Sequence, residues 1–245
     1  MKCQYFGDKR DLFKYDLLLD LLQAHTTGRI AVVPMLTPDD DGKEGSLKRK
    51  DRGLRNGELF EFLEQHRSGS ESGECLSAWR EFFLKQGVLY LPYRDIPPYY
   101  TYTDRENYFN QVPTEYLQDT CMFIDPDIGI EHGKPSYMRK RGIGGIDKYL
   151  FLDDLEKLSQ RAQNVVFVVY QHMQFNSKLR ARDTIMRASR VSKKLGRPVA
   201  FIREADLAFL VFSDSDSSFD KACNAMKMHA SKHALSADSV GVCDE

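Results

Sequence analysis

The sequence lacks the features that mark membrane proteins and disulfide-built secreted proteins. No apolar run approaches the roughly 18 residues that a membrane-spanning helix needs, and the opening MKCQY has no apolar core of a signal peptide. The five cysteines are scattered, odd in number and without a C-x-x-C pair, so we expect neither a disulfide framework nor a cysteine zinc site. These absences predict a cytoplasmic protein without a membrane partner.

An excess of charge of one sign is also missing. The chain has 35 Lys and Arg against 36 Asp and Glu, which gives a formal net charge of −1. This balance excludes a protein that binds nucleic acid through its overall positive charge, so any such binding requires a local basic patch. A chain of 245 residues buries roughly 73% of its surface on folding, which is enough for one large core.

Two familiar catalytic signatures are missing as well. The sequence has no G-x-S-x-G nucleophile elbow and no Cys–His signature. The GIGG segment at positions 142–145 lacks the G-K-[ST] ending of a phosphate-binding loop and does not follow a predicted strand. These absences exclude the serine and cysteine hydrolases that carry such signatures, and the P-loop nucleotide hydrolases.

Alternating strand and helix patterns are present along most of the chain. Apolar residues at helical spacing predict helices over 11–23, 58–66, 76–85, 150–162 and 177–195. Short apolar runs predict strands over 29–34, 88–92, 121–125 and 165–170, followed by a hairpin of 199–203 and 207–213. This order predicts an α/β fold with a mostly parallel, doubly wound sheet and a terminal antiparallel hairpin.

We expect the domain organisation to follow from this pattern. Positions 1–213 form one α/β domain with an insertion around 46–118. The serine- and aspartate-rich run near 213–218 predicts a linker, and 214–245 is expected to be that linker with a peripheral helix and tail.

Polar residues follow two of the predicted strands where ligands bind in open α/β sheets. The first strand is followed by TPDDD at 37–41, and the third by DPDIGIE at 125–131. Carboxylates at two ends of one sheet predict either an acceptor for a substrate amine or a magnesium site. The structural alternative is that Asp and Pro simply form turns after each strand.

Two motifs resemble a known family. The segment GDKRDLFKY at 7–15 resembles the G-N-x-A-D-x-x-K-H opening of the bacterial large-subunit ribosomal RNA adenine-N6 methyltransferases, with Gly7, Asp11 and Lys14 in register. Asp125 and Pro126 match the first half of that family's D-P-P-Y motif. The chain is still more similar to an uncharacterised bacterial and phage set with Y-F-G-D, K-Y-x-L-L, M-L-T-P-D-D and D-P-D-N-G-x-E motifs.

The methyltransferase resemblance implies a class I fold, whose last strand runs antiparallel, and S-adenosylmethionine as cofactor. It implies catalytic roles for Asp125, Asp127 and Lys14, with Asp125 accepting a hydrogen bond from the target amine. The residues implied to hold the cofactor are Asp11, Tyr15, Thr37, Asp39 and Gly42. The sequence departs from the family at the glycine motif, which is replaced by TPDDDG, and after Pro126, where no aromatic residue follows directly. Tyr170 falls where the family has a later aromatic residue.

Two other functions are open from the sequence. A magnesium-dependent nuclease or phosphohydrolase on the same fold would use carboxylate ligands from Asp39, Asp40, Asp125, Asp127 and Glu131. A non-catalytic nucleic-acid-binding module would use phosphate contacts, and the candidates are Lys134, Arg139, Lys140, Arg141, Arg180 and Arg187.

Overall fold

The computed structural model describes residues 2–25, 28–39, 53–66, 74–92, 99–131, 145–173 and 177–244. Several candidate residues from the sequence lie outside these ranges: Asp40, Gly42, Lys134, Arg139, Lys140 and Arg141. Most of the GIGG segment lies outside them too.

A seven-stranded sheet forms the centre of the fold. Its strands are β1 (Arg29–Pro34), β2 (Leu89–Pro92), β3 (Cys121–Asp125), β6 (Val166–His172), β7 (Val199–Glu204), β8 (Leu207–Ser213) and β9 (Val240–Cys243). They lie in the order β2-β1-β3-β6-β8-β7-β9. The first four are parallel, and β8 lies between β6 and β7, antiparallel to both. The predicted α/β fold with a mostly parallel sheet and an antiparallel hairpin is confirmed.

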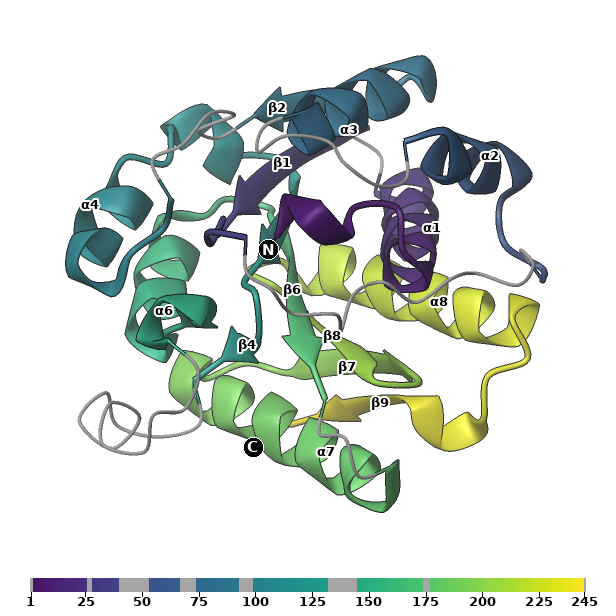
Figure 1. The fold of residues 1–245 in the computed structure, drawn as a ribbon. Coiled ribbons are helices and arrows are strands. Elements are labelled where there is room, and N and C mark those ends of the chain that lie inside the picture. The colour runs from purple at the N-terminus through teal and green to yellow at the C-terminus, as the bar shows by residue number, and fades with distance from the viewer. Residues whose placement is uncertain are drawn as a thin grey trace.

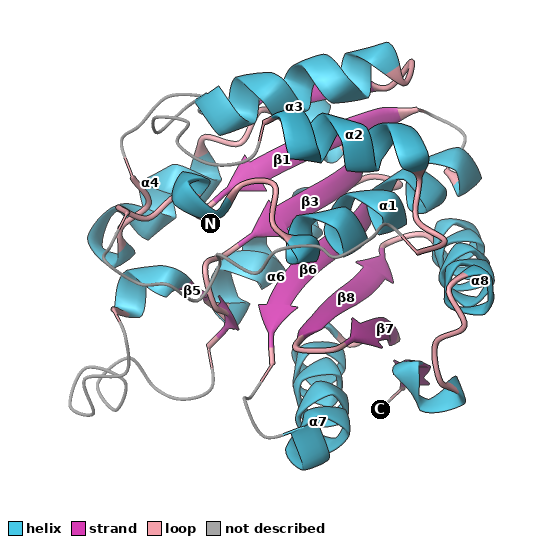
Figure 2. Ribbon diagram, turned by 45° about the vertical axis from the view of Figure 1, so that its right-hand side comes forward, coloured by secondary structure: helices cyan, strands magenta, loops and turns pink. Residues whose placement is uncertain are grey.

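Helices cover both faces of this sheet, as Figures 1 and 2 show. One face carries α1 (Lys9–Ala24), α2 (Gly57–Gln65), α3 (Glu74–Lys85) and α8 (Asp216–Lys232). The other carries α4 (Arg105–Asn110), α6 (Leu152–Arg161) and α7 (Ser177–Leu195). A short two-stranded sheet of β4 (Gly129–Ile130) and β5 (Tyr149–Leu150) lies beyond the end of β3. Among the described residues, no helix combines the length and apolar character that crossing a membrane requires.

The central strands β1, β3, β6 and β8 are buried on both faces, which explains their continuous apolar runs. In β1, Ile30 and Val32 pack under α1, while Ala31 and Val33 contribute to the core on the opposite face. Successive side chains of a strand point to opposite faces, so each strand supplies both cores.

Helix α1 starts two residues before the predicted position because Asp8 caps it. The Asp8 carboxylate accepts hydrogen bonds from the backbone N–H groups of Arg10, at 2.7 Å, and Asp11, at 3.1 Å. Gly7 precedes the cap with a φ of 82°, and its N–H donates to Asp11 Oδ2 at 2.8 Å. Glycine adopts this backbone conformation without steric cost. The turn therefore fixes Asp11 in place before the helix begins.

The last 30 or so residues differ from the expected peripheral tail. Ser215 caps α8, and Phe219 and Met226 of α8 belong to the core under α1. Strand β9 pairs with β7 and forms one edge of the sheet. The expected insertion likewise supplies β2, which pairs with β1. The strand predicted over 88–92 is therefore β2, whereas β9 was not predicted because it is only four residues long.

One disulfide corrects the expectation drawn from the cysteines. Cys3 and Cys75 are bonded, with their Cα atoms 5.8 Å apart and a separation of 72 positions in the sequence. The bond joins the segment before α1 to the second residue of α3. Spacing in the sequence could not reveal it, because the two cysteines approach only when α3 packs beside the N-terminus.

Candidate functional site

The strand ends that the sequence singled out do meet in the structure. Asp125 is the last residue of β3 and pairs with Pro34, the last residue of β1. Strand β6 continues on the other side of β3, where Ile124 pairs with Val169. The beginning of α1 lies over this edge, so residues from three strands and one helix share it. This is the edge where open α/β sheets bind ligands.

Lys14 connects Asp11, a candidate residue on α1, with Asp125, the candidate at the end of β3. Its Nζ atom lies 3.1 Å from Asp11 Oδ1 and 3.1 Å from Asp125 Oδ2. The side chain of Lys14 is only 8% exposed and that of Asp125 only 2%. The pair of Asp11 and Lys14 on one face of α1 is therefore a buried ion pair rather than a solvated one.

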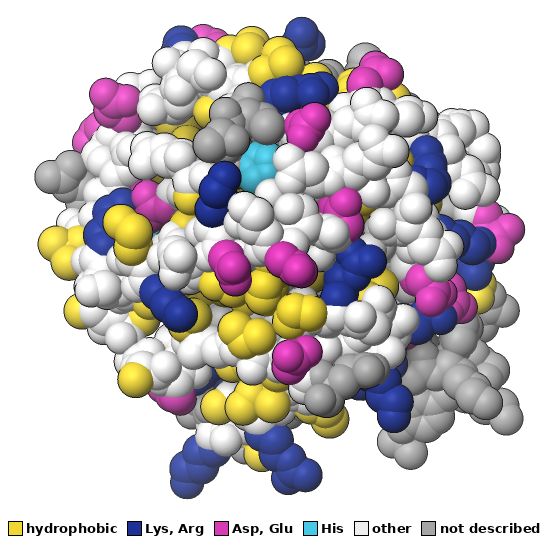
Figure 3. Space-filling view, turned by 180° about the vertical axis from the view of Figure 1, so that it is seen from behind, with side chains coloured by type: hydrophobic (Ala, Val, Ile, Leu, Met, Phe, Trp, Pro, Cys, Tyr) yellow, Lys and Arg dark blue, Asp and Glu magenta, His cyan; other side chains and the backbone are white. Residues whose placement is uncertain are grey.

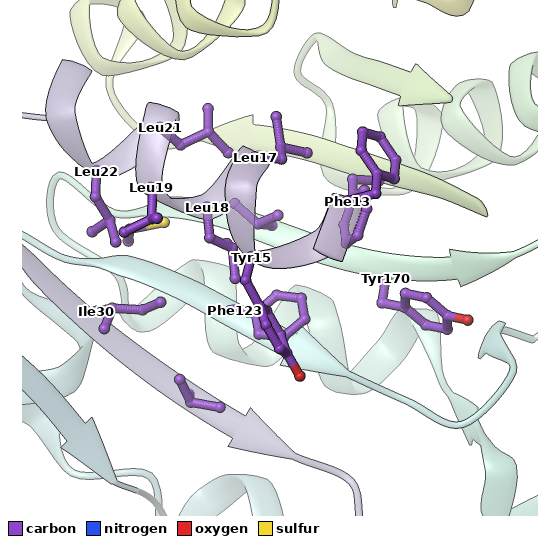
Figure 4. Close-up of a cluster of buried hydrophobic side chains, with 14 of the residues drawn as sticks. Phe13, Tyr15, Leu17, Leu18, Leu19, Leu21, Leu22, Ile30, Phe123 and Tyr170 are labelled. Carbon is purple, nitrogen blue, oxygen red and sulfur yellow. The ribbon is translucent and has the colours of Figure 1, made fainter. Parts of the chain in front are cut away.

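Four aromatic rings surround the Lys14 ammonium. Their centroids lie 5.0–6.0 Å from Nζ, and the rings belong to Tyr15, Trp79, Phe123 and Tyr170. A cation at this distance from aromatic rings is attracted by their electron-rich faces when it lies over them. Figure 4 shows Tyr15 and Leu18 directed from α1 toward the strands that carry Ile30 and Phe123. Trp79 comes from α3, and the sequence did not single it out for the site.

The charges at this edge do not balance. Asp8, Asp11 and Asp125 are all buried, and the buried lysine Lys14 contacts two of them, Asp11 and Asp125. Burial, and next the Asp11 carboxylate, raise the pKa of Asp8 to about 7, although Lys14 and Arg10 oppose this. Burial alone would lower the pKa of Lys14, but the Asp125 and Asp11 carboxylates outweigh it and raise that pKa well above its usual value. Carboxylates thus outnumber the ammonium in a poorly solvated site.

The Tyr15 hydroxyl lies in this negative environment. Tyr15 is fully buried, and its hydroxyl has no hydrogen bond of ordinary geometry within the described structure. Burial raises its pKa well above the usual value, and the negative charges of Asp11 and Asp125 raise it further.

A second ion pair forms the rim of the site. Arg10 Nη2 bonds Asp206 Oδ2, and His172 Nε2 lies 3.6 Å from the same oxygen. Burial would raise the pKa of Asp206, but the hydrogen bonds from His172 and Arg10 hold it well below its usual range. No sequence pattern marks Asp206, because it lies in the turn between β7 and β8.

Other predicted site residues lie in different surroundings. Lys148 Nζ is 3.6 Å from Asp127. Glu131 accepts from the Leu152 N–H at 3.1 Å and lies 3.7 Å from Arg190. Exposed Asp39 accepts from Gln4 N at 3.4 Å.

These contacts separate the carboxylates that the magnesium hypothesis needs. Among the described residues, no three of Asp39, Asp125, Asp127 and Glu131 lie close enough to share a metal ion. Thr37, a predicted cofactor residue, is buried after β1.

Arg187, a predicted nucleic-acid contact, serves the fold instead. It is buried, and its guanidinium donates to the Ile130 carbonyl at 2.9 Å and to Asp183 at 3.2 Å. Arg180 remains partly exposed on α7. Over the face of the molecule in Figure 3, basic and acidic side chains are interspersed.

Comparisons with known proteins leave the site to be interpreted from its own chemistry. No protein-family model matches the chain, and no curated protein matches it.

Proposed function

We propose that this protein is an S-adenosylmethionine-dependent methyltransferase that acts on an amine of a nucleic-acid base. One observation carries the proposal: Asp11, Lys14 and Asp125 converge at the carboxyl edge of the sheet with aromatic rings around them. These are the residues that match the motifs of the ribosomal RNA adenine methyltransferases. The antiparallel last strand of the hairpin, β8, supports the same fold family.

The charge of the site fits a cationic cofactor. S-adenosylmethionine supplies an electrophilic methyl group on a positively charged sulfur. Asp11 and Asp125 together outnumber Lys14, and Asp8 adds negative charge as the pH rises through 7, so the site retains negative charge that attracts a second cation. The ring faces of Tyr15 and Tyr170 would add to that attraction. Asp11 and the Tyr15 hydroxyl are the described groups that would hold the cofactor.

Asp125 suits the acceptor role. A carboxylate has about four positions for accepted hydrogen bonds, and Lys14 uses one of them. A further bond from the target amine would orient the amine nitrogen and draw off its proton as the new N–C bond forms and the bond between the methyl group and the sulfur breaks, which would leave the cofactor as a neutral thioether. Lys14 is then a positioning residue, because it fixes the Asp125 carboxylate from the side of α1.

The experiment measures cofactor binding and methyl transfer separately. Calorimetric titration with S-adenosylmethionine is expected to give a dissociation constant in the micromolar range. We expect Asp11→Asn to weaken binding by at least about tenfold, which corresponds to the loss of one charged hydrogen bond. Asp125→Asn should keep cofactor binding and lose transfer of labelled methyl groups to cellular RNA or DNA. Lys9→Ala, an exposed lysine of the same helix, is the matched control and should change neither.

Two results would overturn the proposal. Mg²⁺ binding that is lost in Asp125→Asn, without cofactor binding, would favour the nuclease or phosphohydrolase hypothesis. Salt-sensitive binding of nucleic acid, without either ligand, would favour a non-catalytic binding module.

A further inference from the structure

A second cluster of ligand-type side chains lies on the opposite side of α1. Asp16 lies beside His229 in the last turn of α8 and His233 at its C-terminal cap, and the two histidines are four residues apart and so lie on the same side. Asp16 and Lys14 are two residues apart on α1, about 200° around the helix axis. The cluster is therefore separate from the Lys14 site and does not depend on the proposed function.

The three side chains are close enough to hold one ion. One oxygen of Asp16 and one nitrogen from each histidine lie within 4.8 Å of one another. Asp16 Oδ2 and His233 Nε2 are 2.9 Å apart, yet His233 Nε2 has no hydrogen bond of ordinary geometry. Ligands of a tetrahedral zinc ion, bound at about 2.0–2.1 Å, lie roughly 3.3 Å from one another. The cluster needs only small adjustments to reach that arrangement.

The hydrogen bonds of His229 indicate a neutral imidazole, which is the form that binds a metal. Its Nδ1 atom lies 2.6 Å from the Asp20 carboxylate, which can only accept, so Nδ1 carries the proton. Its Nε2 atom lies 2.7 Å from Arg55 Nη1, which can only donate, so Nε2 presents a lone pair. A histidine that donates to a carboxylate through one nitrogen and presents a lone pair on the other is the usual form in zinc sites.

A side-chain cation, the guanidinium of Arg55, already lies at the cluster. Its Nη1 atom lies 2.7 Å from His229 Nε2 and 3.4 Å from Asp16 Oδ2, between two of the three ligand groups. Its other terminal nitrogen bonds Glu204, so the guanidinium has a partner to which it can withdraw. The side chains of Asp16, His229 and His233 are at most 3% exposed, and an ion there would be shielded from solvent.

We propose that Asp16, His229 and His233 form a zinc-binding site at the α1–α8 interface, with Asp20 orienting His229 and Arg55 holding the position of the ion. Three protein ligands leave the fourth zinc position for water or a small anion. The ligand set of two imidazoles and one carboxylate suits Zn²⁺ better than Mg²⁺, which prefers oxygen ligands.

The test is titration of the full chain with Zn²⁺ against a chromophoric chelator, and with Co²⁺ followed by visible absorption. We expect one tightly bound ion per chain and the strong bands of tetrahedral cobalt. His233→Ala, which removes a ligand just after the end of α8, should weaken zinc binding by at least about 100-fold, and Asp20→Ala by about 10- to 100-fold. Arg55→Met should strengthen it by about tenfold or more, because a competing positive charge is lost.

His66→Ala is the matched control, since His66 follows the last residue of α2 and its ring bonds only Phe62 O in the described structure. Its zinc affinity should equal that of the unchanged protein. No binding by the unchanged chain, or equal losses in His66→Ala and His233→Ala, would overturn the site. Unchanged affinity in Arg55→Met would overturn the role of Arg55. Circular dichroism of each variant separates loss of a ligand from loss of folding.

Discussion

At the scale of single residues, Lys14 decides how the site is organised. Its ammonium contacts one carboxylate from its own helix and one from β3. Removing one partner of a buried ion pair leaves the other charge without compensation, at a cost of roughly 3–5 kcal/mol. Lys14 therefore ties the position of α1 to the end of the central strand.

Asp8 gives the site a pH dependence. Burial and the Asp11 carboxylate raise its pKa to about 7 in the folded protein, while Lys14 and Arg10 oppose the shift; the ordinary value of an aspartate is about 3.9. The folded state thus binds more protons than the unfolded state between these two pH values. The Asp8 contribution to stability is complete below about pH 4 and is lost as the pH rises through 7.

We expect Asp8→Asn to remove this dependence. Asn also caps helices, so α1 should still form. Chemical denaturation of both proteins from pH 4 to 8 measures the difference in their free energies of unfolding. The unchanged protein should lose up to about 4 kcal/mol relative to the variant across this range. Parallel stability curves would show that Asp8 does not titrate near neutrality. Glu131, whose burial also raises its pKa to about 7, is the same in both proteins and cancels.

At the scale of elements, the sequence predicted long, regular segments well. Strands β1 and β3 and helix α7 have the predicted bounds, because their apolar periodicity and flanking residues agree. Helix α4, with six residues, and strands β4 and β5, with two each, were missed. Such short elements are stabilised by contacts from elsewhere in the chain, which periodicity does not record.

The segment after β3 shows how such contacts work. Gln171, fully buried in β6, accepts from the Ile130 N–H at 2.9 Å and donates to the Ile128 carbonyl at 3.1 Å. Gly129 lies between them with a φ of 127°, and a Cβ atom there would lie 2.4 Å from the Gln171 amide. The side-chain amide of Gln171 thus makes hydrogen bonds with this backbone of the kind that a neighbouring strand would make.

Gly129→Ala is expected to destabilise the protein by at least about 3 kcal/mol, because it combines backbone strain with disrupted hydrogen bonds to Gln171. Gly196→Ala is the matched control, since Gly196 has a φ of 61° and nothing within 4 Å of an added Cβ atom. The control should lose only about 1–2 kcal/mol, the cost of the backbone conformation. Urea denaturation measures both, and equal losses would contradict the proposed clash.

At the scale of the whole molecule, the sequence predicted the sheet edge but only part of the site. Asp11, Lys14 and Asp125 were found because motifs and strand ends mark them. Trp79 lies within the helix predicted over 76–85, but a helical pattern does not say which part of the chain that helix contacts. Asp206 lies in a hairpin turn. The charge of the site depends on how these distant segments pack, so the excess of carboxylates could not be predicted from the chain.

The same packing determines how much of the chain is needed to fold. A chain that ends at Ser213 keeps every segment that the sequence assigned to the domain but lacks α8 and β9. It loses the burial of Phe219 and Met226, each worth roughly 1.5–3 kcal/mol, and exposes the side of α1 that packs on α8. Because whole domains are stable by only about 5–15 kcal/mol, we expect this chain to show no cooperative thermal transition by circular dichroism.

A chain that ends at Ser239 is the control. It keeps α8 and loses only the edge strand β9, so it should unfold cooperatively at a reduced temperature. Cooperative unfolding of the 1–213 chain near the full-length midpoint would show that α8 is the peripheral element that the sequence predicted. Loss of folding in the shorter chain alone would show that α8 belongs to the domain, because it completes the apolar layer that holds α1 against the sheet.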